Sequence, residues 1–373
     1  MKQKLSYMLQ TLFRTITAAR SAYLSRITKK AELRNIEKKR PLWSSVPITD
    51  EQDREIREYW KYISGCDIDT RWHRLYASYL HCPIRKDFFP EILYSTKLEK
   101  KLSNPKFYGV LSDKGFLTSL FPGDNTYRMP KSLVYNSYGT FTDGDKTIIS
   151  ENEAIRAISD AGVVIIKPTI DTSSGEGVLK VDIKNGYDAE NGLSVKDIFR
   201  RYKQNFIVQE CVKQSRYLAD LCEKSLNTFR VITYICEGKV FHAPLSLRMG
   251  NGSSFVDNIH RGGVNIGISD DYKLRKYAFT EYGDKYEVHP YSKVRFEGYD
   301  ISPLCSIVEV AHRLHGYVPM LKMISWDWSL DENDIPVLIE MNISGQSVWF
   351  PQMVNGESFF GENTKYFANL IKK

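Results

Sequence analysis

Three oxygen-bearing side chains near the end of the chain could bind a hard cation. Glu340 and Asn342 stand two residues apart in PVLIEMN, so a strand there would place both on one face. The run before it, MISWDWSL, leads into the turn DENDIP, and if Leu330 pairs with Val337, Asp327 lies opposite the glutamate of the next strand. Mg²⁺ prefers such oxygen ligands, and a cation would offset the repulsion between two close carboxylates. We therefore expect a metal site at Asp327, Glu340 and Asn342, with a solvated polar strand face as the alternative.

A lysine at the end of an apolar run could add a positive charge to a bound anion. Lys167 stands near the end of VVIIKP and is followed by a small, glycine-rich stretch at residues 172–177 and a second β-rich run. Backbone N–H groups in such a loop can converge on phosphate oxygens, because glycine has no side chain to obstruct them. The alternative is an ordinary hairpin turn, and no G-x-x-x-x-G-K-[ST] string occurs in the chain.

Arginines and a histidine between these two regions could bind an anionic group. Arg230 lies in SLNTFRV and Arg248 in LSLRMGNG, and the planar fork of arginine matches phosphate or carboxylate oxygens in pairs. His260 and Arg261 lie in VDNIHRGG, where the paired glycines that follow would let a ligand approach the backbone closely. Each arginine alone could equally be one partner of a surface ion pair. The whole string is less typical of a surface than of a binding site.

These residues must be positioned by a fold of mixed elements. From about residue 106, short β-rich runs are separated by glycine turns, and helical patterns such as SENEAIRAISDAG lie between several of them. Antiparallel-looking strands with interspersed helices indicate an α+β architecture. Residues 41–105 mix Trp, Tyr and charged residues with prolines and are typical of a helical segment. The sequence therefore predicts an α+β domain over residues 106–373 that follows a helical N-terminal extension.

The first 40 residues carry most of the net charge. They hold eleven Lys or Arg against two Glu, a net charge of +9, whereas the whole chain has +7. Such a basic segment could contact an anionic membrane surface or a partner through residues 1–30, or it could dock on its own domain or fray. Because the remaining chain is nearly neutral, we expect no nucleic-acid binding. An apolar stripe at helical spacing predicts a basic amphipathic helix and contains Leu5, Leu9, Leu12, Phe13, Ile16, Ala19, Tyr23 and Ile27.

Composition excludes several classes of protein. With 42% hydrophobic residues in 373, the chain can fill a core, so general disorder is excluded. Six cysteines without a Cys-x-x-Cys pair predict neither a disulfide scaffold nor a structural zinc site. No run approaches the roughly 18 apolar residues that would span a bilayer. We therefore expect a cytoplasmic protein, with at most peripheral contact to the membrane.

Taken in order, these strings resemble the ATP-grasp superfamily, and most closely its sugar-transfer-associated members of surface polysaccharide synthesis, over about residues 107–371. The resemblance implies that Lys114, after Asp113, and Lys167, before Pro168, are nucleotide lysines. Residues 172–177 resemble the lid over the triphosphate, and IVQECV resembles an adenine hinge. The implied cofactor-binding residues are Lys114, Lys167, Ser173, Ser174, Gly175, Gly177, Gln209, Glu210, Cys211 and Val212.

The resemblance also implies a division of the domain and roles for other residues. A lid subdomain would cover about residues 147–210, and a C-terminal subdomain about 211–373. Either Asp220 or Glu223 would bind the ribose. An imidazole titrates near neutral pH, so His260 could deprotonate an incoming amine, with an uninvolved histidine as the alternative. The implied catalytic residues are Arg230, Arg248, His260 and Arg261, and the implied magnesium ligands are Asp327, Glu340 and Asn342.

The activity implied by the resemblance is that of an ATP- and Mg²⁺-dependent carboxylate–amine ligase. A substrate carboxylate would attack the γ-phosphate of ATP, and an amine would displace phosphate from the resulting acylphosphate. The reaction would join an amino acid or a similar small molecule to a sugar-linked or lipid-carrier-linked acceptor. Two alternatives stay open: a phosphotransferase on the same fold, and a non-catalytic nucleotide-binding partner of a glycosyltransferase.

Overall fold

The computed structural model describes residues 2–103, 105–170, 172, 175–253, 255, 257 and 262–372, with side chains from residue 19 onward except residue 21. The chain forms two compact units, one made of residues 1–103 and 345–373 and the other of residues 104–344. Residues 345–373 thus group with the N-terminal helices, apart from the rest of 106–373. Helices and two antiparallel sheets together confirm the predicted α+β class.

The first unit is helical and packs around aromatic side chains. Trp60 and Phe89 lie 5.0 Å apart between ring centroids, and Phe89 lies 5.2 Å from Phe360, so rings distant in sequence share one core. Its longer α-helices are α1 (Lys2–Lys38), α2 (Arg40–Ser44), α3 (Asp50–Ser64), α4 (Arg71–Ser78), α13 (Trp349–Asn355) and α14 (Thr364–Lys372). Short helical turns complete it: α5 (Glu91–Leu93), a π-helical turn (Tyr94–Leu98), α6 (Glu99–Leu102) and a 3₁₀ turn (Gly361–Asn363).

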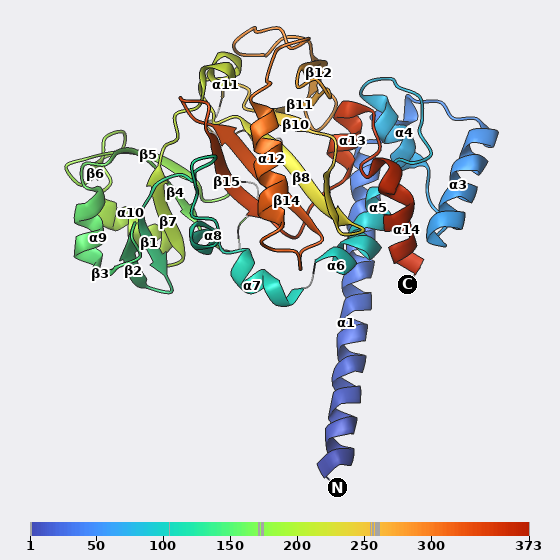
Figure 1. The fold of residues 1–373 in the computed structure, drawn as a ribbon, viewed down its shortest axis with the longest axis horizontal. Coiled ribbons are helices and arrows are strands. Elements are labelled where there is room, and N and C mark those ends of the chain that lie inside the picture. The colour runs from blue at the N-terminus through green and yellow to red at the C-terminus, as the bar shows by residue number, and fades with distance from the viewer. Residues whose placement is uncertain are drawn as a thin grey trace. The chain divides into compact units, whose positions relative to one another are not determined.

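Helix α1 forms over the predicted basic segment. Figure 1 shows its N-terminal half extending away from the other helices of its unit. Tyr23, Leu24 and Ile27 are exposed on it. Averaged over all 37 residues, however, the apolar residues show almost no preference for one face, so the amphipathic pattern predicted for residues 5–27 does not extend along the whole helix. Within the described chain, every helix is too short or too polar to cross a membrane.

The second unit contains two antiparallel sheets, and strand β4 of the first sheet carries Lys167. Helices α9 (Glu151–Ile158) and α10 (Val195–Tyr202) contribute Ile158, Ile198 and Phe199 to its apolar core. The strand order is β3-β2-β1-β7-β4-β5-β6. The strands are β1 (Ser132–Ser137), β2 (Thr140–Asp143), β3 (Ile148–Ile149), β4 (Gly162–Pro168), β5 (Leu179–Lys184), β6 (Tyr187–Asp188) and β7 (Phe206–Glu210).

The second sheet has eight strands and carries the acidic hairpin. Helix α12 (Leu304–His315) lies across β8 and β14 (Figure 1). Along the path the order is β13-β12-β11-β10-β8-β14-β15, and β9 also pairs with β8. The strands are β8 (Thr228–Cys236), β9 (Lys239–His242), β10 (Ser246–Met249), β11 (Val264–Ile268), β12 (Leu274–Phe279), β13 (Lys285–Tyr286), β14 (Met323–Leu330) and β15 (Pro336–Asn342). Shorter helical elements of this unit are a 3₁₀ turn (Pro105–Phe107), α7 (Tyr108–Leu111), α8 (Lys114–Leu120) and α11 (Arg216–Leu221).

Two glutamates of the first unit, the buried Glu91 and the half-buried Glu99, hold the segment that follows the second sheet. One carboxylate oxygen of Glu91 accepts hydrogen bonds from Ser347 Oγ at 3.1 Å, Val348 N at 2.8 Å and Trp349 N at 3.1 Å. Glu99 accepts from Gln346 N at 3.1 Å. The two side chains therefore satisfy backbone donors that would otherwise be buried without partners.

Loss of the Glu91 side chain should destabilise the first unit. Glu91→Ala leaves three donors without an acceptor, so we expect the free energy of unfolding to fall by about 3 kcal/mol. Glu91→Gln keeps an acceptor oxygen and should retain most of that stability. Urea denaturation followed by tryptophan fluorescence measures both values, and an alanine variant as stable as the wild type would contradict this role.

Glu91 should also make the free energy of unfolding fall as the pH rises. Burial and the charge of Glu32 raise the pKa of Glu91 to about 8. The folded chain then keeps a proton that the unfolded chain releases near pH 4.3, so this contribution to stability falls as pH rises between these values. Below about pH 6.5 the buried His73, whose pKa burial lowers to about 4, acts in the opposite direction.

Denaturation of the wild type and of Glu91→Gln at about pH 6.5 and about pH 8 separates the contribution of Glu91 from those of other groups. We expect the wild type to lose about 1–2 kcal/mol over this window and Glu91→Gln to lose clearly less. Equal losses in the two proteins would show that another group titrates there.

Candidate active site

The β14–β15 hairpin brings the predicted acidic residues together. Asp327 pairs directly with Glu340, and Ser325 pairs with Asn342. The predicted pairing of Leu330 with Val337 is wrong, because Leu330 pairs with Pro336 instead. A β-bulge between Asp327 and Trp328 absorbs the one-residue difference, so Ile339 is the extra residue on β15 and the two carboxylates still face each other.

Two arginines surround the Asp327 carboxylate. Arg230 on β8 contacts it with Nε at 2.6 Å and Nη2 at 3.1 Å, and Arg248 on β10 approaches it with Nη2 at 3.1 Å. Burial alone would raise the pKa of Asp327, but the charges and hydrogen bonds of the arginines outweigh it and hold the pKa below its usual value. Asp327 is therefore ionised at neutral pH.

Both predicted nucleotide lysines lie at the same hairpin. Lys114 is the first residue of α8, which Asp113 caps, and its Nζ lies 3.3 Å from Glu340 Oε1. Burial lowers the pKa of Lys167 on β4, while the charges of Glu340 and Asp327 raise it and that of Lys114 lowers it further. The lysine of the first sheet and the acidic hairpin of the second sheet thus share one electrostatic environment.

The cluster is richer in cations than the sequence suggested, which changes the argument for a metal. The arginines compensate Asp327 and Lys114 compensates Glu340, so repulsion between the carboxylates does not by itself require a metal ion. Asn342 Nδ2 lies 3.4 Å from Asp327 Oδ2, so its amide reaches the same place. Among the described residues, no group of three or more His, Cys, Asp or Glu side chains forms a metal site. Two carboxylates and an amide still make an oxygen set that fits Mg²⁺, which commonly completes its shell with water and phosphate.

A third carboxylate lies behind Arg248. Asp257 Oδ2 is 3.5 Å from Arg248 Nε and also hydrogen-bonds Thr228 Oγ1. Burial raises the pKa of Asp257, and Arg248 lowers it. The cluster then holds four cations, Lys114, Lys167, Arg230 and Arg248, against three carboxylates. This surplus of positive charge suits a polyanion that brings its own divalent cation.

The side chains of the predicted hinge are used within the protein. Gln209 donates to Ser132 Oγ at 3.2 Å, and Glu210 accepts from Lys131 N at 2.9 Å and pairs with Arg128. Cys211 and Val212 follow directly after β7. Burial raises the pKa of the Cys211 thiol, and the charge of Lys180 opposes that shift, which places Lys180 near the hinge.

Arg128 is a positioning residue that no sequence pattern pointed to. It pairs with Glu210 at the end of β7 and, through Nε at 2.7 Å, with Asp331 in the β14–β15 turn. Its backbone also bonds the hairpin, with Arg128 N donating to Pro336 O and Leu338 N donating to Arg128 O, each at 2.9 Å. The residue therefore fixes the hinge of one sheet to the acidic hairpin of the other.

The glycine-rich turn leads back onto β4 and α10. Gly175 and Gly177 both have positive φ, and a Cβ on Gly177 would lie 2.8 Å from Pro168. Tyr202 on α10 donates to Gly177 O at 2.6 Å and lies 3.1 Å from Ile166 O, so it ties the turn to the lysine-bearing strand. The remaining predicted site residues, Ser173, Ser174, His260 and Arg261, lie outside the described residues.

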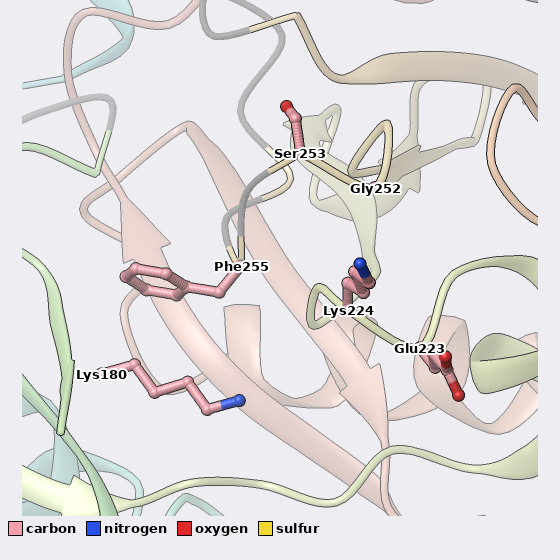
Figure 2. Close-up of a pocket in the computed structure, with 6 residues that line it drawn as sticks. All are labelled: Lys180, Glu223, Lys224, Gly252, Ser253 and Phe255. Carbon is pink, nitrogen blue, oxygen red and sulfur yellow. The ribbon is translucent and has the colours of Figure 1, made fainter. Parts of the chain in front are cut away.

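An open pocket of about 500 Å³ includes Lys180, whose charge acts on Cys211 at the hinge. Lys180 of β5, Glu223 and Lys224 after α11, and Gly252, Ser253 and Phe255 line it (Figure 2). Of the two candidates for the ribose, Glu223 lines this pocket, whereas Asp220 lies 3.8 Å from Arg216 in an ion pair on α11.

Comparison with known proteins identifies the family of the chain. Matching solved structures include the VanG D-Ala:D-Ser ligase from Enterococcus faecalis (15% identity over 71% of this chain and 61% of that one, TM-score 0.41). An L-amino acid ligase from Bacillus licheniformis is 12% identical over 71% of this chain and 48% of that one, with a TM-score of 0.39. D-alanyl-alanine synthetase A from Vibrio cholerae is 15% identical over 71% of this chain and 65% of that one, with a TM-score of 0.38. The chain thus spans less than two thirds of the length of each structure, and no curated protein matches it. The model of the sugar-transfer-associated ATP-grasp family matches residues 93–367, and because that is well over half of the chain, the chain belongs to this family.

Proposed function

We propose that this chain is an ATP-dependent carboxylate–amine ligase that works through an acylphosphate. The observation that carries the proposal is the convergence of Lys114 and Lys167 with Glu340 and Asp327 in one cluster. Lysines from α8 and the first sheet meet carboxylates from the second sheet there, as a site for a metal-bound triphosphate requires. Family membership supports the same reaction class.

Each part of the cluster has a task in this reaction. Asp327, Glu340 and Asn342 would hold Mg²⁺, which when bound neutralises charge on the triphosphate. Lys114 and Lys167 would hold phosphate oxygens, and Arg230 and Arg248 would exchange their contacts with Asp327 for contacts with the transferred phosphoryl or the acyl group. Burial and the charge of Arg248 lower the pKa of Arg230. An additional anion that enters the cluster would therefore stabilise the charged forms of both arginines.

The nucleoside would lie between the hinge and this cluster. Backbone groups of Cys211 and Val212 would face the base, and the Glu223 carboxylate would accept hydrogen bonds from the ribose hydroxyls. The glycine turn tied down by Tyr202 is placed on the strand of Lys167, where it would cover the phosphates and exclude water from an acylphosphate. His260 and Arg261 stay proposed as catalytic residues on the resemblance alone.

The proposed substrates are a small carboxylate, such as an amino acid, and an amine carried on a sugar-linked acceptor of surface polysaccharide synthesis. Family membership is the support for this class. The test measures ADP release by the full chain with Mg–ATP and panels of amino acids and uronic acids, with and without amines such as amino sugars. Release that requires both a carboxylate and an amine is expected, and a stable phosphorylated product formed without amine would instead identify a kinase.

We further propose that α1 attaches the enzyme to an anionic membrane surface at the cytoplasmic face. The basic residues Arg20, Arg26, Lys29 and Lys30 are exposed on it, beside exposed Tyr23, Leu24 and Ile27. Each basic residue near such a surface contributes about 1 kcal/mol, so replacing these four by glutamine should weaken binding to anionic vesicles by about a hundredfold or more.

Vesicle co-sedimentation of the full chain measures this effect. The matched control replaces four exposed cations of the second unit, Lys184, Lys196, Arg200 and Arg201, and should bind as the wild type does. Equal binding to neutral and anionic vesicles, or equal losses in the two variants, would contradict attachment through α1.

A further inference from the structure

The segment at residues 289–292 lies against residues that line the pocket. His289 is buried, and its Nε2 lies 2.8 Å from Gly250 O just after β10. Because a carbonyl only accepts, Nε2 carries the proton, and Nδ1 accepts from Tyr291 N at 3.2 Å and Ser292 N at 3.3 Å. Ser292 Oγ donates to Leu221 O at 2.7 Å at the end of α11. The segment therefore fixes the two chain segments that carry most of the pocket lining.

Tyr291 contacts three of the residues that line the pocket. Its hydroxyl donates to Glu223 Oε1 at 3.3 Å, and Lys224 Nζ lies 4.9 Å from its ring centroid. Its ring packs against Gly252, where an added Cβ would lie 2.6 Å from ring carbons. Gly252 also has φ +88°, so a glycine is required there both by the backbone and by the tyrosine. Figure 2 shows Glu223, Lys224 and Gly252 among the residues that line the pocket.

The residues that line the pocket are linked to both the hinge and the charged cluster. Lys180 on one side acts on the thiol of Cys211 at the hinge. Gly252 and Ser253 on the other side belong to the chain that leaves β10 after Arg248 and reaches Asp257, which contacts Arg248 again. A ligand with its base at the hinge and its phosphates at the cluster would therefore carry its sugar past Glu223.

We propose that Tyr291 is a positioning residue that orients Glu223 to recognise the vicinal hydroxyls of the ATP ribose; this inference rests on the proposed function. The tyrosine hydroxyl occupies one carboxylate oxygen of Glu223 and leaves the other oxygen and the remaining lone pairs for the sugar. Glu223 is exposed, so without this contact its carboxylate would sample several rotamers, and the ribose would have to order it on binding. The vicinal hydroxyls could instead belong to a sugar-linked acceptor, and the experiment separates the two sources.

Calorimetric binding of Mg–ATP, Mg–2′-deoxy-ATP and Mg–3′-deoxy-ATP to the full chain tests the proposal. Because 3.3 Å is long for this hydrogen bond, Tyr291→Phe should weaken ATP binding by only about three- to fivefold. The same substitution should weaken binding of both deoxy nucleotides less than binding of ATP, so the preference for ATP over them becomes smaller. Tyr187→Phe, which alters an exposed tyrosine of the other sheet, is the matched control and should leave all three affinities unchanged.

Two further variants test whether Tyr291 acts through Glu223. Gly252→Ala forces the Tyr291 ring to move and should reduce the preference for ATP at least as much as Tyr291→Phe. Glu223→Gln should reduce it as well, and adding Tyr291→Phe to Glu223→Gln should have no further effect, because the tyrosine acts through the carboxylate.

The outcomes separate this inference from the function on which it rests. Equal weakening of ATP and deoxy nucleotides in Tyr291→Phe, or unchanged ATP binding as expected for a role at the acceptor sugar, would overturn the positioning role while leaving ATP binding intact. A wild-type chain that binds none of the three nucleotides would overturn the proposed function together with this inference.

Discussion

Glu340→Gln is expected to abolish ATP turnover, with a loss of at least about a hundredfold, and to leave the melting temperature close to that of the wild type. The Glu340 side chain is 29% exposed and pairs with Lys114 at 3.3 Å, whereas the Asp327 side chain is 6% exposed and pairs with two arginines, so the charge of Glu340 contributes less to folding than that of Asp327. In the proposed reaction the same carboxylate holds the magnesium ion on the triphosphate, where its loss is not compensated.

The control for this prediction is Glu332→Gln, which alters an exposed glutamate in the turn of the same hairpin. It should retain full activity. Lys167→Met should reproduce the loss of turnover, and Lys196→Met on the surface of α10 should not. Activity near the wild-type level in either Glu340→Gln or Lys167→Met would refute the assigned site, provided that the variant melts normally.

Asp327→Asn is expected to impair folding as well as turnover. The Asp327 side chain is only 6% exposed and is the shared counter-charge of Arg230 and Arg248. Its neutralisation leaves two largely buried guanidinium groups underpaired, so we expect the free energy of unfolding to fall by about 3–5 kcal/mol. For a unit of this size that corresponds to roughly 10 °C in melting temperature.

Asp334→Asn provides the matched control in the same hairpin. Asp334 is exposed and has φ +60°, a conformation that asparagine also tolerates, so its replacement should leave stability unchanged. Adding Arg230→Met to Asp327→Asn should recover part of the lost stability, because it removes one unpaired charge. An Asp327→Asn variant as stable as the wild type would show that the arginines have other counter-charges.

The sequence predicted the strands that carry the site because their apolar runs are long and bounded by turn residues. VVIIKP, MISWDWSL and PVLIEMN form β4, β14 and β15 as expected. The apolar run KVFHAPLSLR forms two strands, β9 and β10, which both pair with β8 and are separated by a segment containing Pro244. Proline lacks the N–H that a continuous ladder would need there.

The register and partners of the acidic hairpin could not be predicted from the sequence. Nothing in PVLIEMN indicates that Ile339 is an extra residue in a bulge, although the carboxylates end up opposite each other as expected. The arginines at Asp327 come from strands that are distant along the chain, so their charge compensation follows only from the sheet topology. The tie from Arg128 to Glu210 and Asp331 depends on how two sheets meet, and no local pattern encodes it.

The most direct test of the account is anomalous diffraction from crystals of the full chain grown with Mn²⁺ and a non-hydrolysable ATP analogue. We expect a manganese signal about 2.2 Å from carboxylate oxygens of both Asp327 and Glu340, with the terminal phosphates at the amino groups of Lys114 and Lys167. A metal-bound nucleotide located away from this cluster would contradict the claim that the two lysines and the acidic hairpin form one triphosphate site.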